Sequence, residues 1–414
     1  MAAGAALGLT VTLAGCGGGP GSDEVTLRLV AADYGASDAD SSKKYWADLV
    51  EKYEAEHPDI DVEVTVLSWE KVDAEVAKMV KEGNAPDMAQ IGAYADYAAQ
   101  GKLYAADELL SVPTQGDFLP ALSSAGEVNR IQYGMPFASS TRLMFYNKDL
   151  FEAAGITEAP GSWEQLADDA ALLKASGVKY PFALPLGSEE AQAETLMWLL
   201  AGGDGYTDQV GSYTLDSDPN VKTFEWLKEN LVDEELVGPT PPGELNRQDA
   251  FDAFSAGEVG MLNGHPTLIG QAKEKGVDFG MVPLPGRDGE AEATMGVADW
   301  MMAFKQNGHR DEIGSFLDFV YSKENVLDFS ERYNILPVTD GAVEEMAGDE
   351  KYKELWSFLE ELPNSQLYPV GNTSWAQVSA DIKENIGKAL APGAGPRAVL
   401  TDIQNKAKLA ESAE

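Results

Sequence analysis

The side chains best placed for chemistry in this chain are aromatic rings and polar groups at the predicted ends of strands and helices. Sugar C–H faces stack on Trp and Tyr rings, and sugar hydroxyls bond to carboxylates and amides. Ligands of α/β proteins gather at strand ends, so we take residues there as candidate ligand contacts. The candidates are Asp33, Tyr34, Tyr94, Ser140, Thr141, Glu190, Asn263, His265, Asp299, Trp300, Asn372 and Trp375.

Two tryptophans carry most of the stacking hypothesis. Trp300 follows Asp299 in a predicted strand, and Trp375 begins a predicted helix after the Tyr- and Pro-containing segment 368–372. We expect the two rings and the carboxylate to hold a pyranose from opposite sides. The competing interpretation is that the rings pack in the core, as most large aromatic side chains do.

The polar candidates also have a plainer interpretation. Ser, Asp and Asn commonly cap helices or bond to their own backbone in turns. The residues open to both interpretations are Asp33, Ser140, Thr141, Glu190, Asn263, His265 and Asp299.

Sequence motifs of catalysis and of metal or phosphate binding are missing. The chain contains no Gly-x-Ser-x-Gly, no Gly-x4-Gly-Lys-Ser/Thr and no His-Glu-x2-His. Its 3 histidines, His57, His265 and His309, are too dispersed to favour a multi-histidine metal site. We therefore expect no catalytic residue, no metal and no cofactor.

The charge of the chain limits its partners. The 414 residues include 69 acidic and 30 basic side chains, for a net charge of −39. Nucleic acids and anionic membrane surfaces both require clusters of Lys and Arg, so we expect neither as a partner. The same charge favours a neutral or cationic solute over an anionic one, although a local site can differ from the average.

The single cysteine lies at the end of a small, apolar N-terminal run. Residues 13–16 read Leu-Ala-Gly-Cys, which resembles the lipobox of bacterial lipoproteins. That resemblance implies a signal at 1–16, a diacylglycerol on the Cys16 thiol, an extracytoplasmic protein held at the cell membrane, and a flexible tether at 17–24. No Lys or Arg precedes Cys16, and the alternative is an ordinary secretory signal with a chance cysteine.

The first part of the folded chain alternates strand and helix patterns. Strands are predicted at residues 25–30, 60–66 and 86–88, with amphipathic helices at 43–57 and 72–80 between them. This βαβαβ order is typical of a mostly parallel α/β sheet.

Residues 134–156 are predicted to connect two such units. A strand enters at 135–137, hydroxyl residues follow at 139–141, and a second strand leaves at 143–146. Asn147 or Asp149 then caps a helix that stops at Gly155. A strand broken by hydroxyl residues suits a chain that crosses between lobes beside a cleft.

The same stretch carries a family resemblance. Pro136-x6-Leu-x2-Tyr-Asn-Lys-x-Leu-Phe-x2-Ala-Gly-Ile, followed by Ser-Trp-Glu-Gln-Leu at 162–166, resembles the first interlobe crossing of solute-binding proteins of sugar ABC importers. The resemblance extends from residue 25 to about 408, through weaker matches in the same order. The group that the chain resembles is the one that contains maltose-binding protein. His265 is a departure from the pattern expected in that group.

The resemblance implies a two-lobed α/β fold of the type II periplasmic-binding-protein kind, with mostly parallel sheets and three crossings. The expected lobes are residues 25–137 with 293–338, and 138–292 with 339–414. It also implies a monomer without catalytic activity that delivers a carbohydrate to a membrane permease. The alternatives are a polyol, polyamine or peptide cargo in the same role, or a secreted glycoside-active enzyme.

Overall fold

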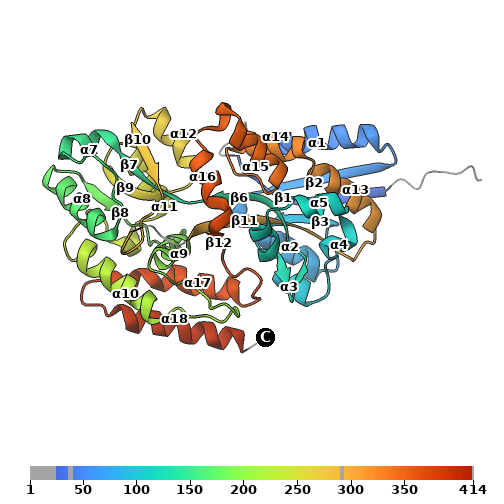
Figure 1. Ribbon diagram of the computed structural model, residues 1–414. Helices are drawn as coiled ribbons and strands as arrows, with labels where there is room; N and C mark the ends of the chain where they lie inside the picture. The colour runs from blue at the N-terminus through green and yellow to red at the C-terminus, as the bar shows by residue number, and fades with distance from the viewer. Residues whose placement is uncertain (1–24, 36–40, 290–292, 413–414) are drawn as a thin grey trace, which may run out of the picture.

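The computed structural model describes residues 25–35, 41–289 and 293–412. Two β-sheets lie side by side, each with helices around it, and strands in the middle of the molecule join them (Figure 1). The expected signal, lipidation site and tether, at residues 1–24, lie outside the described residues.

The first sheet contains the predicted βαβαβ unit. Its strand order is β12-β11-β3-β1-β2, with β6 paired to β11. β1 is parallel to both β2 and β3, whereas β11 is antiparallel to β3 and β6. The strands are β1 (Val25–Ala32), β2 (Ile60–Leu67), β3 (Met88–Ile91), β6 (Met135–Thr141), β11 (Thr294–Ala303) and β12 (Ser365–Gln366).

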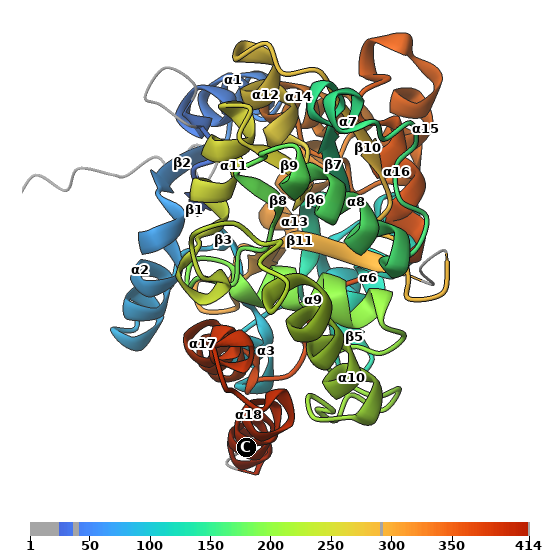
Figure 2. The ribbon, with the colours of Figure 1, turned by 90° about the vertical axis from the view of Figure 1, so that its left-hand side faces the viewer.

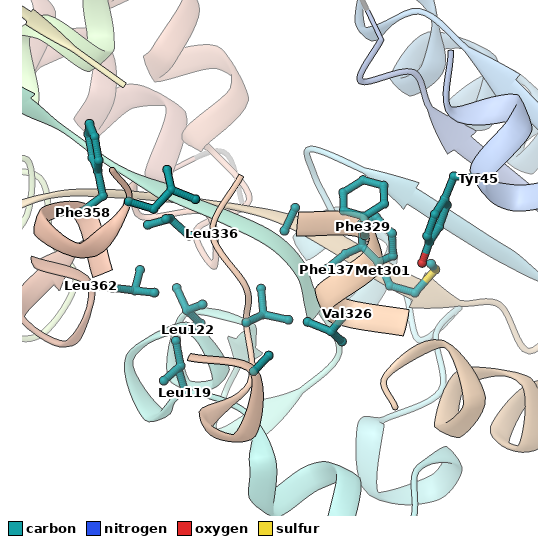
Figure 3. Packing of buried hydrophobic residues seen from close by; sticks show 14 of the residues in the cluster. Tyr45, Leu119, Leu122, Phe137, Met301, Val326, Phe329, Leu336, Phe358 and Leu362 are labelled. Atoms are coloured by element: carbon teal, nitrogen blue, oxygen red, sulfur yellow. The ribbon is translucent and has the colours of Figure 1, made fainter. Parts of the chain in front are cut away.

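Amphipathic helices cover this sheet. In α1 the large side chains recur at helical spacing and are buried, while the polar side chains between them face water. Part of the core formed in this way runs from Tyr45 through Phe137 and Phe329 towards Leu336 and Phe358 near the centre of the molecule (Figure 3). The helices are α1 (Ser42–Glu56), α2 (Trp69–Lys81), α13 (Arg310–Val320) and α14 (Lys323–Tyr333).

The second sheet is mixed, which corrects the expectation that it would be mostly parallel. Its order is β10-β7-β9-β8, and β7 is antiparallel to both neighbours while β8 is parallel to β9. β7 leads away from the first sheet and β10 leads back towards it, so these two strands run in opposite directions. The strands are β7 (Leu143–Asn147), β8 (Tyr180–Ala183), β9 (Val259–Gly264) and β10 (Phe279–Val282).

A second core forms beneath this sheet. Every residue of α9 is buried, and the helix packs against β11, α10 and α17. The C-terminal helices α17 and α18 pack near α9 and α10 rather than on the first sheet (Figures 1 and 2). The helices are α7 (Lys148–Ala154), α8 (Trp163–Ala175), α9 (Ala191–Ala201), α10 (Asp218–Leu227), α11 (Arg247–Ser255), α12 (Thr267–Glu274), α17 (Trp375–Asn385) and α18 (Pro396–Glu411).

The chain passes from the first sheet to the second at Arg142. β6 pairs with β11 as far as Thr141, and β7 pairs with β9 from Leu143 onward. The boundary expected between Phe137 and Ala138 is therefore wrong, because β6 continues in the first sheet beyond it. The strand was also expected to be broken by the hydroxyl residues, but β6 is continuous through residues 139–141 and the crossing follows them.

Two further segments of the chain lie beside this one. The chain returns between β10 and β11, and residues 334–338 run along β6, where the Ser139 amide donates to the Leu336 carbonyl at 3.0 Å. The Ser139 hydroxyl also donates to the Pro337 carbonyl at 2.8 Å. α15 (Asp340–Gly348) and α16 (Trp356–Glu361) follow, and β12 then joins β11. These adjacent segments place the junction of the two sheets next to one cavity.

Candidate ligand-binding site

A cavity of about 680 Å³ lies at the junction of the two sheets. The first sheet and its helices contribute one wall and the second unit contributes the other, which is the position of an interlobe cleft. The charged and aromatic residues that line it are Trp69, Asp73, Asp96, Arg142, Glu189, Glu190, Arg247, His265, Asp299, Tyr368, Trp375 and Lys383.

The structure brings half of the predicted candidates to this cavity. They come from β6 and β11, the residue after β9, the cap position of α9, and the segment that leads into the start of α17, which are far apart in sequence. The candidates that line the cavity are Ser140, Glu190, His265, Asp299, Asn372 and Trp375.

Trp300 and Tyr94 are in the core instead. Trp300 is 0% exposed, and its ring meets the Tyr94 ring edge to face at 5.2 Å. The Tyr94 hydroxyl donates to the Ala125 carbonyl. The register of β11 against β6 shifts between Asp299 and Trp300, and only Asp299 lines the cavity. The expectation that Trp300 and Trp375 both contact the sugar is therefore wrong for Trp300.

Three other candidates have structural partners outside the cavity wall. The Thr141 hydroxyl, fully buried, donates to the Phe358 carbonyl at 2.8 Å. Asp33 accepts from the Ser42 amide at 2.8 Å and from the Ser41 hydroxyl at 2.7 Å, which matches the turn-and-cap interpretation. Asn263 lies deeper than the main cavity.

Tyr34 supports Asp299 from behind the cavity wall. Its hydroxyl donates to Asp299 Oδ2 at 2.6 Å and accepts from Gln90 Nε2 at 2.9 Å. Burial raises the pKa of Asp299 to about 6, and the nearby Asp73 carboxylate contributes in the same direction. Tyr34 and Gln90 thus connect the Asp299 carboxyl group, which lines the cavity, to β3 of the first sheet.

Two arginines missed as candidates from the sequence face the same cavity. Arg142 Nη2 lies 3.0 Å from Glu190 Oε1, and Arg247 Nε lies 2.6 Å from Glu190 Oε2. Arg247 also reaches Glu189 at 2.5 Å. Each guanidinium is therefore already neutralised by a carboxylate. Arg142 could have been found from its place directly after the hydroxyl residues.

Trp375 forms an aromatic wall with two tyrosines. Its ring stacks on Tyr368 with centroids 5.1 Å apart at 27°, and it meets Tyr206 at 5.5 Å. The side chain is 9% exposed, at the start of α17. Nearby, Asn372 donates to the Gly211 carbonyl at 3.0 Å. These contacts hold the ring rigidly, which suits stacking with little loss of conformational entropy.

His265 is a neutral member of the site. Burial and the two neighbouring guanidinium groups, Arg142 and Arg247, lower its pKa well below the usual value. Its Nδ1 lies 2.9 Å from the Thr267 hydroxyl. Within the part of the chain that the structure describes, no group of His, Cys, Asp and Glu has an arrangement that could hold a metal ion.

The sequence matches a known family over most of the described chain. The match is to bacterial extracellular solute-binding proteins and covers residues 37–327. The chain belongs to this family. The suspected relationship is confirmed.

Individual relatives agree with this assignment. A Brucella abortus protein named only as a binding protein is 30% identical over 396 residues, 93% of each chain. The sn-glycerol-3-phosphate-binding periplasmic protein UgpB of Escherichia coli is 26% identical over 318 residues, 71% of each chain.

The fold is also that of a sugar-binding relative of known structure. Maltose-bound MalE3 of T. maritima superposes with a TM-score of 0.75 at 21% identity, covering 93% of this chain and 99% of that one. The two-lobed type II fold is thus confirmed. Among the described residues, no helix has the length and apolar character needed to span a membrane.

Proposed function

We propose that the protein captures a neutral sugar or oligosaccharide in the interlobe cavity and delivers it to the permease of an ABC importer. Binding closes the two lobes around the solute, and the closed form is what the permease receives. The protein catalyses no reaction and acts as a monomer.

The observation that carries this proposal is the composition of the cavity. The stacked rings of Trp375 and Tyr368 both line the cavity, and Asp299 and Glu190 bring carboxylates to the same space. This pairing of a ring and planar acceptors is what a sugar requires. The ligands named for relatives of this fold, maltose among them, agree with this choice.

An anionic ligand fits the cavity less well. The relative that binds sn-glycerol-3-phosphate makes such a cargo worth testing. In this chain, however, Arg142 and Arg247 are both paired with Glu190. A phosphate would have to displace that carboxylate from two guanidinium groups at once.

The N-terminal region completes the proposed role. Lipidation of Cys16 would anchor the protein outside the cytoplasm at the cell membrane, with residues 17–24 as the tether. A tethered receptor stays close to the permease, which raises its effective concentration there.

A thermal-shift screen tests the function. A ligand that binds only the folded state raises the melting temperature, by an amount that depends on its concentration relative to Kd. Mono- and oligosaccharides should stabilise the protein and be recovered unchanged. Stabilisation by spermidine, a dipeptide or sn-glycerol-3-phosphate alone would contradict the sugar assignment, and release of reducing sugar from an oligosaccharide would indicate a glycoside-active enzyme.

A further inference from the structure

A small inner pocket opens from the second wall of the cavity. It measures about 20 Å³, and Arg142, Glu190, Arg247 and His265 line both spaces. Such a volume admits one water-sized group. The four shared side chains form the mouth of the inner pocket.

Asn263, at the bottom of this pocket, has a buried acceptor without a partner. The side chain is 4% exposed, and its Nδ2 donates to Glu194 Oε1 at 2.8 Å. Its Oδ1 makes no hydrogen bond to any residue that the structure describes. Leaving a buried acceptor unpaired is costly, so this atom indicates a donor that comes from outside the protein.

Glu194 offers a donor in the same pocket. It is 5% exposed, and both Asn263 Nδ2 and Trp198 Nε1 donate to its Oε1, each at 2.8 Å. Burial raises the pKa of Glu194 to about 8, so the carboxyl group keeps its proton at neutral pH. The pocket therefore presents both an acceptor and a proton donor.

The charges at the mouth restrict what can enter. Arg142 and Arg247 stand on either side of Glu190, which lies within 3.0 Å of both. The two guanidinium groups would repel an ammonium group, and Glu190 would repel a carboxylate. A neutral hydroxyl meets neither difficulty, and it can donate to Asn263 while accepting from Glu194.

We propose that the inner pocket receives the primary hydroxyl of an exocyclic hydroxymethyl group, with Asn263 Oδ1 as its acceptor. A sugar ring is too large for the pocket and remains in the main cavity. A hydroxymethyl group extends one carbon beyond the ring and can pass the mouth. The protein would thus select hexoses, free or within a short chain, over pentoses that lack this group. This inference rests on the proposed sugar-binding function.

Matched sugars test the selection on the whole chain. Calorimetry and thermal shift would compare D-glucose with D-xylose, D-galactose with L-arabinose, and cellobiose with xylobiose, whose members differ only in hydroxymethyl groups. We expect the hexose member of at least one pair to bind at least about tenfold more tightly, the value of one or two hydrogen bonds. D-glucuronate should bind more weakly than D-glucose.

A substitution locates the effect. Asn263→Leu removes the acceptor at similar volume and should bring the hexose-to-pentose ratio close to one. Asn220→Leu is the matched control. Asn220 is fully buried, its Oδ1 makes no hydrogen bond to a described residue, and it does not line either pocket. It should leave the ratio unchanged. Asn263→Ala serves the same purpose if the leucine variant does not fold.

The outcomes separate the two proposals. If no sugar binds, the proposed function fails. If pentoses bind as well as their hexose partners, the function stands and the pocket holds an ordered water only, which overturns the inference. A hexose preference that persists in both Asn263 variants would also overturn it.

Discussion

At the scale of single residues, the two tryptophans of the stacking hypothesis differ in position, although both are largely buried. Trp375 lines the cavity, whereas Trp300 is 0% exposed in the core. Trp375→Ala should weaken sugar binding by about 1–3 kcal/mol, the range for a lost stacking contact with a planar ligand. The measurement is calorimetric affinity for the best sugar from the screen.

Trp300→Ala is the comparison for that variant. It should lower the free energy of unfolding by about 3–5 kcal/mol, as loss of a large core ring does. Trp375→Ala should lose less stability, because part of its ring faces the cavity. If Trp375→Ala lost much stability but no affinity, Trp375 would belong to the core and the aromatic wall would be misassigned.

The buried carboxyl group of Glu194 predicts a pH dependence. Its pKa is raised from 4.5 to about 8 by burial, so the folded state resists losing this proton. The unfolded state ionises at lower pH, and wild-type stability should therefore fall as pH rises from about 4.5 to about 8. Glu194→Gln, which keeps an acceptor for Trp198 and Asn263, should remove this part of the loss.

The readout is the difference in unfolding free energy between Glu194→Gln and wild type across that pH range. Other titrating groups, Asp299 among them, occur in both proteins and largely cancel. The difference should move in favour of the variant as pH rises. A difference that stays constant would mean that the carboxyl group is already ionised at low pH in the folded protein.

Sequence reasoning found the neighbourhood of the site better than its individual contacts. Strand ends and crossings supplied Ser140 and His265, which line the cavity, whereas Asp299 lies within β11. Which of two adjacent residues faces the cavity depends on the register shift within β11, which the sequence does not indicate. Arg142 and Arg247 were missed because their importance depends on pairing with Glu190 across distant segments.

At the scale of elements, the cap of α7 fixes the helix that follows the first crossing. Both Asn147 and Asp149 suit a cap, and the structure selects Asn147, whose Oδ1 accepts from the Leu150 amide at 3.1 Å. Asn147→Ala should lower the free energy of unfolding by about 1 kcal/mol. Asn147→Asp should retain most of that stability. If urea denaturation showed the same loss of unfolding free energy for both variants, the cap bond would contribute little.

The strands themselves were largely predictable, but their pairing was not. Alternation predicted β1 and β2 within two residues of their ends. The mixed second sheet could not be predicted, because direction depends on which strands carry the chain to and from the other sheet. The crossing at Arg142 was misplaced because β6 continues through the hydroxyl residues 139–141, which were expected to interrupt it.

At the scale of the whole molecule, the proposed anchor makes a prediction that does not depend on the cleft. Cys16→Ala should release the protein from the membrane fraction of cells that express it with an intact signal. The variant would have no thiol to carry the diacylglycerol that holds the protein at the membrane. Retention of the variant at the membrane, measured by fractionation and immunoblot, would contradict lipidation at this residue.

The central claim is that a sugar bound between the lobes closes them. Small-angle scattering of wild type and of Trp375→Ala, each without sugar and with the best-stabilising sugar, tests it directly. Wild type at saturation should show a smaller radius of gyration than the free protein. The variant should need a higher sugar concentration to reach the same value. An identical radius for free and saturated wild type would contradict a cleft that closes on its ligand.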